Sequence, residues 1–280
     1  LLPRPERAQV VVAGFDSVTK AGDAVGEIIA QGIIPGGLEM MDGFAIQAAE
    51  DFAKAGYPLD AQALLLCEVD GTNEEVDEHI AAVEALFHKL GATSVRTSQS
   101  EEERARLWAG RKSAFPAVGR ISPDYYCMDG TIPRGQLSHV LLEMQKMSDH
   151  YGLRVANVFH AGDGNLHPLI LFDANVPGEL ERTEEFGGKI LELCVEVGGC
   201  ITGEHGVGYE KLRQMPAQFN DAEIVQFHEL KRAFDQKELL NPGKGIPTLR
   251  SCQEYRSLDM NITPNATVES QQDTKGATHG

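Results

Sequence analysis

The sequence predicts an α+β fold in which helices pack on an antiparallel, ferredoxin-like sheet. Short apolar runs of strand length alternate with longer amphipathic segments along much of the 280-residue chain. Glycine is abundant, at 29 residues, which suits many tight turns. In the first third, the order strand–helix–strand, helix, strand–helix–strand is typical of two ferredoxin-like halves lying side by side.

The elements of that first third follow from local patterns. Residues 10–15 form a β-branched run that predicts a buried strand, and Asp16-Ser17 offers a cap for a helix over 18–31. A later helix begins at Asn73 and ends near Gly91, a typical C-terminal cap. The other expected elements are a strand at 38–41, a helix at 45–55 and strands at 61–69 and 93–97.

The remainder of the chain continues this mixture up to Pro247. Helices are expected at 101–111, 137–151, 178–197 and 222–234, and strands at 125–128, 154–159 and 169–172, with a short strand or turn at 200–202. Residues 1–248 are therefore predicted to form one domain. Residues 249–280 are polar and predict a disordered tail. Because the sequence opens on Leu1, we expect it to be part of a longer protein.

Composition excludes several classes of function. The formal net charge is −17, which disfavours nucleic acid and anionic membrane as partners. No apolar stretch has the length of a transmembrane helix, and we expect no signal peptide. The five cysteines are scattered without a C-x-x-C pair, so we expect neither disulfides nor a cysteine metal cluster. This cysteine usage predicts a cytoplasmic location. An anionic substrate would need a locally cationic or metal-centred pocket.

The strongest chemical signal is the run HAGDGNLHP at 160–168. Its glycines permit a tight reversal between two strands, which can bring His160 and His167 to the same side of a sheet. Two such imidazoles are candidate metal ligands. The alternative is a hairpin whose histidines merely face solvent.

A second signal is the run GEHGVG at 203–208. Glu204 adds a carboxylate to the two imidazoles, which makes a ligand set suited to Zn²⁺, Mn²⁺ or Fe²⁺ with an open position. His205 is then free to act as a base near neutral pH. Taken alone, Glu204 and His205 could equally be a surface turn.

The third signal is the pair Arg111-Lys112 at the end of a predicted helix. A guanidinium matches a carboxylate in a two-pronged geometry, so Arg111 is a candidate for substrate binding, although such a pair is more often a solvated helix face. The glycine-rich run at 241–245 does not have P-loop spacing, and no G-x-G-x-x-G supports a nicotinamide site.

With these motifs the sequence resembles the C-terminal domain of FAD-linked 2-hydroxy-acid oxidases and dehydrogenases, which include D-lactate and D-2-hydroxyglutarate dehydrogenases. The resemblance extends from about residue 8 to 250. Further runs make it most similar to the FAD-linked subunits of bacterial glycolate oxidases: RK at 111–112, AFPAVGR at 114–120, PDYYCMDGTIPR at 123–134 and NPGK at 241–244.

The resemblance implies a role for each candidate residue. His160, His167 and Glu204 would be metal ligands, His205 would remove the substrate hydroxyl proton, and Arg111 would hold the substrate carboxylate. A flavin contact is implied near Asn241. The 2-hydroxyglutarate relatives also use a threonine and a lysine. The corresponding stretch here has Phe115 and the run Tyr125-Tyr126-Cys127 without such groups, which suggests a shorter substrate such as glycolate or lactate.

The resemblance also implies an activity and partners. The expected reaction is oxidation of glycolate to glyoxylate, or of D-lactate to pyruvate, with hydride transfer to FAD. The family's N-terminal FAD-binding domain is absent from this sequence, so the fragment is expected to be inactive alone. Partner subunits, one carrying iron–sulfur clusters, would place it peripherally at the inner membrane. A flavin-free metal hydrolase and a purely structural assembly domain are the alternatives.

Overall fold

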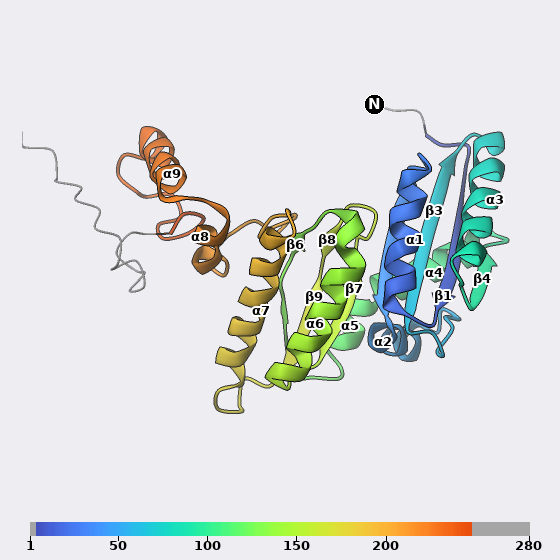
Figure 1. Ribbon diagram of the computed structural model, residues 1–280, viewed down its shortest axis with the longest axis horizontal. Coiled ribbons are helices and arrows are strands. Elements are labelled where there is room, and N and C mark those ends of the chain that lie inside the picture. The colour runs from blue at the N-terminus through green and yellow to red at the C-terminus, as the bar shows by residue number, and fades with distance from the viewer. Residues whose placement is uncertain (1–3, 248–280) are drawn as a thin grey trace, which may run out of the picture. The chain divides into compact units, whose positions relative to one another are not determined.

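A computed structural model describes residues 4–247. The predicted tail at 249–280 lies outside the described residues. The main sheet contains seven strands in the order β4-β1-β3-β2-β7-β9-β5, all joined by antiparallel pairing (Figure 1). These strands are β1 (Arg7–Phe15), β2 (Gly37–Asp42), β3 (Ala63–Gly71), β4 (Ser94–Thr97), β5 (Asp124–Cys127), β7 (Val155–Phe159) and β9 (Pro168–Phe172). The expected antiparallel α+β fold is confirmed.

The first ferredoxin-like unit comprises β1 to β4 with helices α1 (Val18–Ala30), α2 (Gly43–Ala53) and α3 (Asn73–Lys89). Its strand order is β4-β1-β3-β2, so the two strand–helix–strand segments interleave and do not lie side by side as the sequence had suggested. The interleaving places β1 and β3 in the middle of the unit. Their nine-residue pairing runs from Arg7 opposite Gly71 to Phe15 opposite Ala63, which extends the strand predicted at 10–15.

Residues 124–200 repeat this topology. Here β5 and the two-residue β6 (Gly130–Thr131) form the first strand, β7 the second, and β8 (Asn165–Leu166) with β9 the third. The fourth strand is reduced to one bridge between Cys200 and Thr131. Helices α6 (Leu137–Tyr151) and α7 (Glu179–Glu196) make the crossovers. The two units join where β2 pairs with β7.

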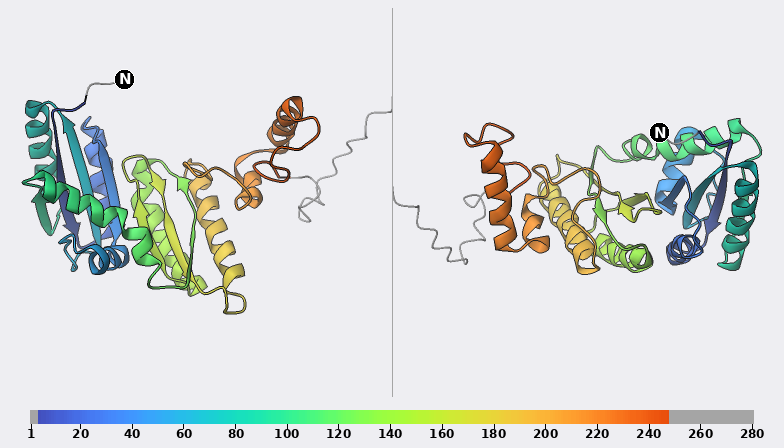
Figure 2. Two further views of the ribbon diagram at one scale, coloured as in Figure 1. Left: turned by 180° about the vertical axis from the view of Figure 1, so that it is seen from behind. Right: turned by 90° about the horizontal axis from the view of Figure 1, so that it is seen from above.

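Helices cover both faces of the sheet, and each face has its own apolar core (Figure 2). On one face α1, α3, α6 and α7 cover side chains such as Val11, Leu65 and Ile170. On the other face α2, α4 (Glu101–Lys112) and α5 (Ala114–Val118) cover Val12, Leu66 and Leu171. Because successive strand residues point to opposite faces, a strand buried on both sides reads as a continuous apolar run.

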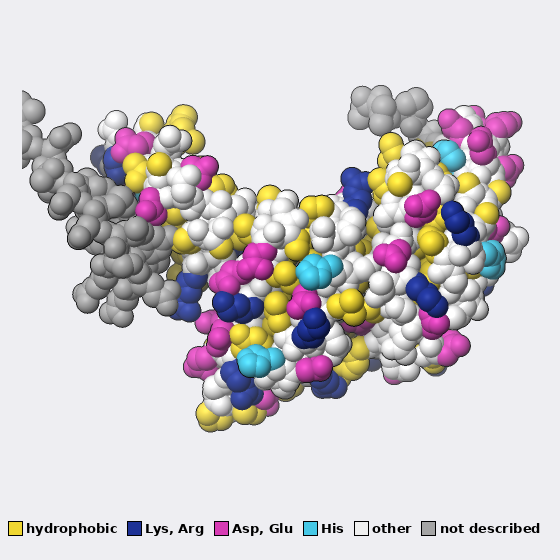
Figure 3. All heavy atoms as spheres, viewed as in Figure 1, with side chains coloured by type: hydrophobic (Ala, Val, Ile, Leu, Met, Phe, Trp, Pro, Cys, Tyr) yellow, Lys and Arg dark blue, Asp and Glu magenta, His cyan; other side chains and the backbone are white. Residues whose placement is uncertain are grey.

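The last described elements are the 3₁₀ turn η2 (Leu212–Gln214), α8 (Met215–Gln218) and α9 (Asp221–Phe234). Another 3₁₀ turn, η1 (Arg134–Gln136), leads into α6. Within residues 4–247, no helix is both long enough and apolar enough to span a bilayer. Acidic and basic side chains are interspersed with apolar ones on the face shown in Figure 3.

Candidate active site

The two motif histidines lie at the joint between the two units, on the hairpin that follows β7. His160 and Asn165 exchange backbone hydrogen bonds of 3.1 and 3.2 Å, which closes the glycine turn between them. Gly164 has φ +71°, and a Cβ there would lie 2.2 Å from the carbonyl oxygen of Ile132, so only glycine fits. His167 follows β8 and is 2% exposed. The alternative in which both histidines merely face solvent is therefore wrong for His167.

Glu204 and His205 lie on a loop whose backbone is hydrogen-bonded to one buried carboxylate. Oδ2 of Asp129, which is fully buried, accepts the backbone N–H groups of Gly203, Glu204 and His205 at 2.9, 2.6 and 2.9 Å. The other oxygen pairs with the ammonium of Lys211, itself 2% exposed. This anchoring excludes a free surface turn, although the side chains of Glu204 and His205 remain about half exposed to solvent.

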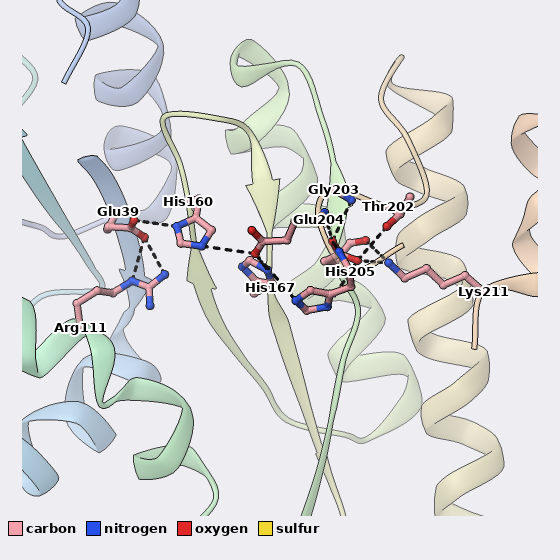
Figure 4. A network of polar contacts seen from close by, with 10 residues as sticks. Glu39, Arg111, His160, His167, Thr202, Gly203, Glu204, His205 and Lys211 are labelled. Atoms are coloured by element: carbon pink, nitrogen blue, oxygen red, sulfur yellow. Dashed lines mark hydrogen bonds and ion pairs between the residues drawn. The ribbon is translucent and has the colours of Figure 1, made fainter. Parts of the chain in front are cut away.

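The side chains of His160, His167 and Glu204 converge to form a candidate metal-binding site (Figure 4). Ligand atoms of His160, His167 and Glu204 all lie within 4.8 Å of one another. Oε1 of Glu204 is 2.9 Å from Nε2 of His167 and 3.7 Å from Nε2 of His160. A second group of Asp129, His167 and His205 meets the same distance limit. We favour the first group because the oxygens of Asp129 already accept hydrogen bonds.

The electrostatics of the two histidines differ. Burial, together with the nearby His160, lowers the pKa of His167 to about 4, so its imidazole is neutral at physiological pH. The hydrogen bond from His160 to Glu39 raises the pKa of His160, partly offset by burial. For Asp129, burial would raise the pKa, but Lys211 and the loop amides outweigh it and hold the pKa at about 2. The loop anchor is therefore ionised at neutral pH.

The predicted substrate arginine is buried against a carboxylate of the same protein. Arg111 donates from Nε and Nη2 to Oε2 of Glu39, at 3.0 and 2.7 Å, and the other oxygen of Glu39 is 2.8 Å from Nδ1 of His160. Among the described residues, Nη1 of Arg111 has no hydrogen-bond partner. Lys112 is exposed and lies over the ring of Trp108, 5.9 Å from its centroid.

Asn241 is not brought into this cluster by any described contact. It is exposed, has φ +45°, and accepts the backbone N–H of Lys244 in a turn after α9. Gly245 of the same glycine-rich run donates to the carbonyl of Gly208, at 2.7 Å. The run 241–245 is thus tied to the loop that carries Glu204 and His205.

Three residues of the network were missed by sequence reasoning: Glu39, Asp129 and Lys211. The sequence carried a signal for Glu39, because a charged residue interrupts the apolar strand at 38–41; the structure shows that it is 7% exposed. Asp129 directly follows the strand predicted at 125–128, which by itself does not indicate a role. Nothing distinguishes Lys211 in the sequence from the solvated lysines.

These features define a class of protein. Residues 4–245 match the family described as FAD linked oxidases, C-terminal domain, and the chain belongs to that family. The glycolate oxidase subunit GlcD of Escherichia coli (strain K12) is 66% identical over 92% of this chain and 52% of its own length. The probable mitochondrial D-lactate dehydrogenase of Danio rerio is 28% identical over 86% of this chain and 48% of its own length.

A solved structure supports the same fold. The 4-ethylphenol oxidase from Gulosibacter chungangensis matches with a TM-score of 0.66 and 16% identity, over 89% of this chain and 56% of that protein. At this identity the likeness concerns the fold. The chain spans about half the length of the relatives named above.

Proposed function

We propose that this chain forms the substrate-binding half of an FAD-dependent dehydrogenase that oxidises a short 2-hydroxy acid, glycolate first and D-lactate second. The observation that carries the proposal is the convergence of His160, His167 and Glu204 beside the exposed imidazole of His205. The names of the relatives support glycolate, because the Escherichia coli protein is a glycolate oxidase subunit and is 66% identical. The D-lactate dehydrogenase at 28% identity supports the same chemistry on a neighbouring substrate.

The donor set fits a divalent metal. Two imidazoles and a carboxylate suit Zn²⁺, Mn²⁺ or Fe²⁺, and the half-exposed side chain of Glu204 leaves room for substrate. Apart from its histidines, the network has three carboxylates and two cations, so its acidic groups exceed its basic groups by one charge. The carboxylates are Glu39, Asp129 and Glu204, and the cations are Arg111 and Lys211. A divalent ion would reverse that balance and make the site attractive to an anionic acid. When bound, it would act as a Lewis acid on the substrate hydroxyl.

His205 is proposed to remove the proton of the substrate hydroxyl. Its Nε2 is 4.0 Å from Oε1 of Glu204, so a hydroxyl held beside Glu204 is within its reach. Its backbone is fixed by Asp129, which limits how far the imidazole can move. FAD, when bound, would supply the acceptor for the hydride that leaves the α-carbon.

The substrate carboxylate is proposed to contact Arg111 through Nη1, the guanidinium nitrogen that Glu39 does not occupy. Phe115 limits the space beside His167, since the two ring centroids are 6.0 Å apart. An apolar wall at this position favours a short substrate over a diacid. Asn241 stays our proposal for a flavin contact, supported by the hydrogen bond that ties its segment to Gly208.

We further propose that the complete protein works with partner subunits, because the Escherichia coli relative is named as a subunit. An iron–sulfur partner, a cytoplasmic location and peripheral attachment to the inner membrane through those partners follow from the family resemblance. They are predictions for the complete protein.

The test is an assay of the full-length, flavin-loaded protein on glycolate and on D-lactate, with an artificial electron acceptor. We expect glyoxylate or pyruvate to form, and turnover to fall when a chelator removes the metal and to return when Zn²⁺ or Mn²⁺ is added. No turnover of either acid by yellow, metal-loaded protein would overturn the proposal. Activity unaffected by complete metal removal would overturn its metal component, and hydrolysis by flavin-free protein would favour the hydrolase alternative.

A further inference from the structure

The first unit contributes a buried ion pair to the joint between the two units. Glu39 lies in β2, where the neighbouring pair Met40–Phe159 sets the register with β7. That register places Glu39 opposite His160, just beyond the end of β7. Its side chain is 9% exposed and is matched by the 8% exposed side chain of Arg111 from α4. The guanidinium gives this buried carboxylate hydrogen bonds and an opposite charge in place of the water that it has lost.

The two oxygens of Glu39 have separate partners. Oε2 accepts both hydrogen bonds from Arg111, and Oε1 is 2.8 Å from Nδ1 of His160. Because the oxygens of this carboxylate are hydrogen-bond acceptors for Arg111 and His160, Nδ1 of His160 is the donor and carries the proton, and Nε2 presents its lone pair. That Nε2 faces Oε1 of Glu204 at 3.7 Å, which is the direction of the candidate metal position (Figure 4).

His160 needs this support more than His167 does. The side chain of His167 is 3% exposed and is packed against Phe115, so its orientation is set by packing even though its Nδ1 has no partner among the described residues. The side chain of His160 is 37% exposed, and its ring would be free to turn without a hydrogen bond at Nδ1. Glu39 is the group that supplies that bond.

We propose that Glu39 is a positioning residue for the metal centre: held by Arg111, it fixes the tautomer and the ring orientation of His160 so that Nε2 can bind the metal. This inference rests on the metal centre proposed above. Carboxylate partners of metal-bound histidines typically change metal affinity by about 10- to 100-fold when they are lost. Arg111 then serves two groups, Glu39 and the substrate.

The test measures Zn²⁺ and Mn²⁺ affinity of the metal-free chain by competition with a chromophoric chelator. Glu39→Gln should lower affinity by about tenfold or more, because the amide cannot accept from both Arg111 and His160. The matched control is Glu68→Gln: Glu68 also pairs with an arginine of α4, Arg104, at 2.6 Å, but touches no histidine. Glu68→Gln should leave metal affinity unchanged.

A double-mutant cycle separates positioning from general destabilisation. In a His160→Ala background, Glu39→Gln should cause no further loss of affinity, because the group that Glu39 orients is gone. Nitrogen-15 NMR of the imidazole should show Nδ1 protonated in the original chain and a changed tautomer in Glu39→Gln. If Glu39→Gln proves unstable, Glu39→Asp, which keeps the charge but is too short to reach both partners, replaces it in the cycle.

The outcomes distinguish two failures. If His160→Ala leaves metal affinity unchanged, the metal centre itself is wrong. If His160→Ala weakens binding but Glu39→Gln does not, or weakens it equally in both backgrounds, the metal centre stands and the positioning role is overturned.

Discussion

Lys211 is buried to 2% exposure because Asp129 gives its ammonium both a side-chain and a backbone oxygen. Lys211→Met would leave the Asp129 carboxylate buried without its cation, and breaking a buried pair in this way costs about 3–5 kcal/mol. We expect urea unfolding to report that loss. Lys189→Met, which removes an exposed lysine paired with Glu192, should change stability by less than about 1 kcal/mol. Equal effects of the two substitutions would contradict the anchoring role of Asp129 and Lys211.

His205 and Glu204 are adjacent in sequence, but their proposed roles differ. His205→Ala should reduce kcat of the full-length protein by about 10²- to 10⁴-fold, the usual contribution of a general base, while the metal content is retained. Glu204→Gln should instead lower the metal content. Elemental analysis of both variants, beside their steady-state rates, checks the division. Loss of metal from His205→Ala would count against it.

The sequence alone predicted the residues proposed to bind metal or substrate or to transfer protons, but not the residues that position them. His160, His167, Glu204 and His205 stand in two dense motifs of residue types that bind metals or protons. Glu39, Asp129 and Lys211 are 82 to 172 positions apart from one another, and only the folded chain brings them to those motifs. The burial of Arg111 against Glu39 was unpredictable for the same reason.

The short contact between β2 and β7 is extended by side chains at both ends. At one end Glu39 holds His160, and at the other Asp42 accepts the backbone and side-chain N–H groups of Asn157 at 2.8 and 2.9 Å. Asp42 also caps α2 through the N–H of Ala45. The joint is therefore held by carboxylates as well as by strand pairing.

Asp42 gives this joint a pH dependence. Burial, opposed by its hydrogen bonds, raises the pKa of Asp42 to about 6, above its usual value near 4. The unfolded chain therefore loses this proton first, and stability falls as pH rises from about 4 to 6. Asp42→Asn cannot ionise, so its stability relative to the original chain should improve over that interval by on the order of 3 kcal/mol.

Chemical unfolding at pH 4.5 and pH 7 checks this expectation. Asp16→Asn is the control, because Asp16 is exposed and pairs with Lys20, which lowers its pKa, so any effect should be small and of opposite sign. A difference between the Asp42→Asn and original chains that does not vary with pH would contradict the raised pKa of Asp42.

Elements were predicted well where they were long. The helix expected at 137–151 is α6 as found, and the long helices near 18–31 and 178–197 differ from α1 and α7 by one residue at their ends. The two-residue strands β6 and β8 and the five-residue α5 were missed, since such short elements carry no periodicity. The second ferredoxin-like unit was also missed, because its fourth strand is a single bridge.

For the molecule as a whole, metal binding should increase the free energy of unfolding. The proposed ligands come from the hairpin at 160–167 and from the loop at 203–205, so an ion would link two segments that are far apart in the sequence. Metal at about 100 times its dissociation constant should raise the free energy of unfolding by about 2.7 kcal/mol. Thermal unfolding with Zn²⁺ and with chelator measures the gain.

The gain should vanish in Glu204→Gln and persist in Glu192→Gln, which changes an exposed carboxylate on α7. A metal-dependent stabilisation that survives Glu204→Gln would assign the ion to another site.

The spread of the network along the chain has a consequence for biosynthesis. The first ferredoxin-like unit is complete by Thr97, so it can fold while the ribosome is still adding residues. The candidate metal position, by contrast, draws on Glu39, on both hairpin histidines, and on a loop whose anchor is Lys211. While Lys211 is still inside the ribosomal exit tunnel, the loop that carries Glu204 lacks its anchor, and the proposed ligand set is incomplete. On the proposed assignment, the complete set of residues that bind and hold an ion is available only after Lys211 has emerged, so the ion would be bound late in synthesis or after it.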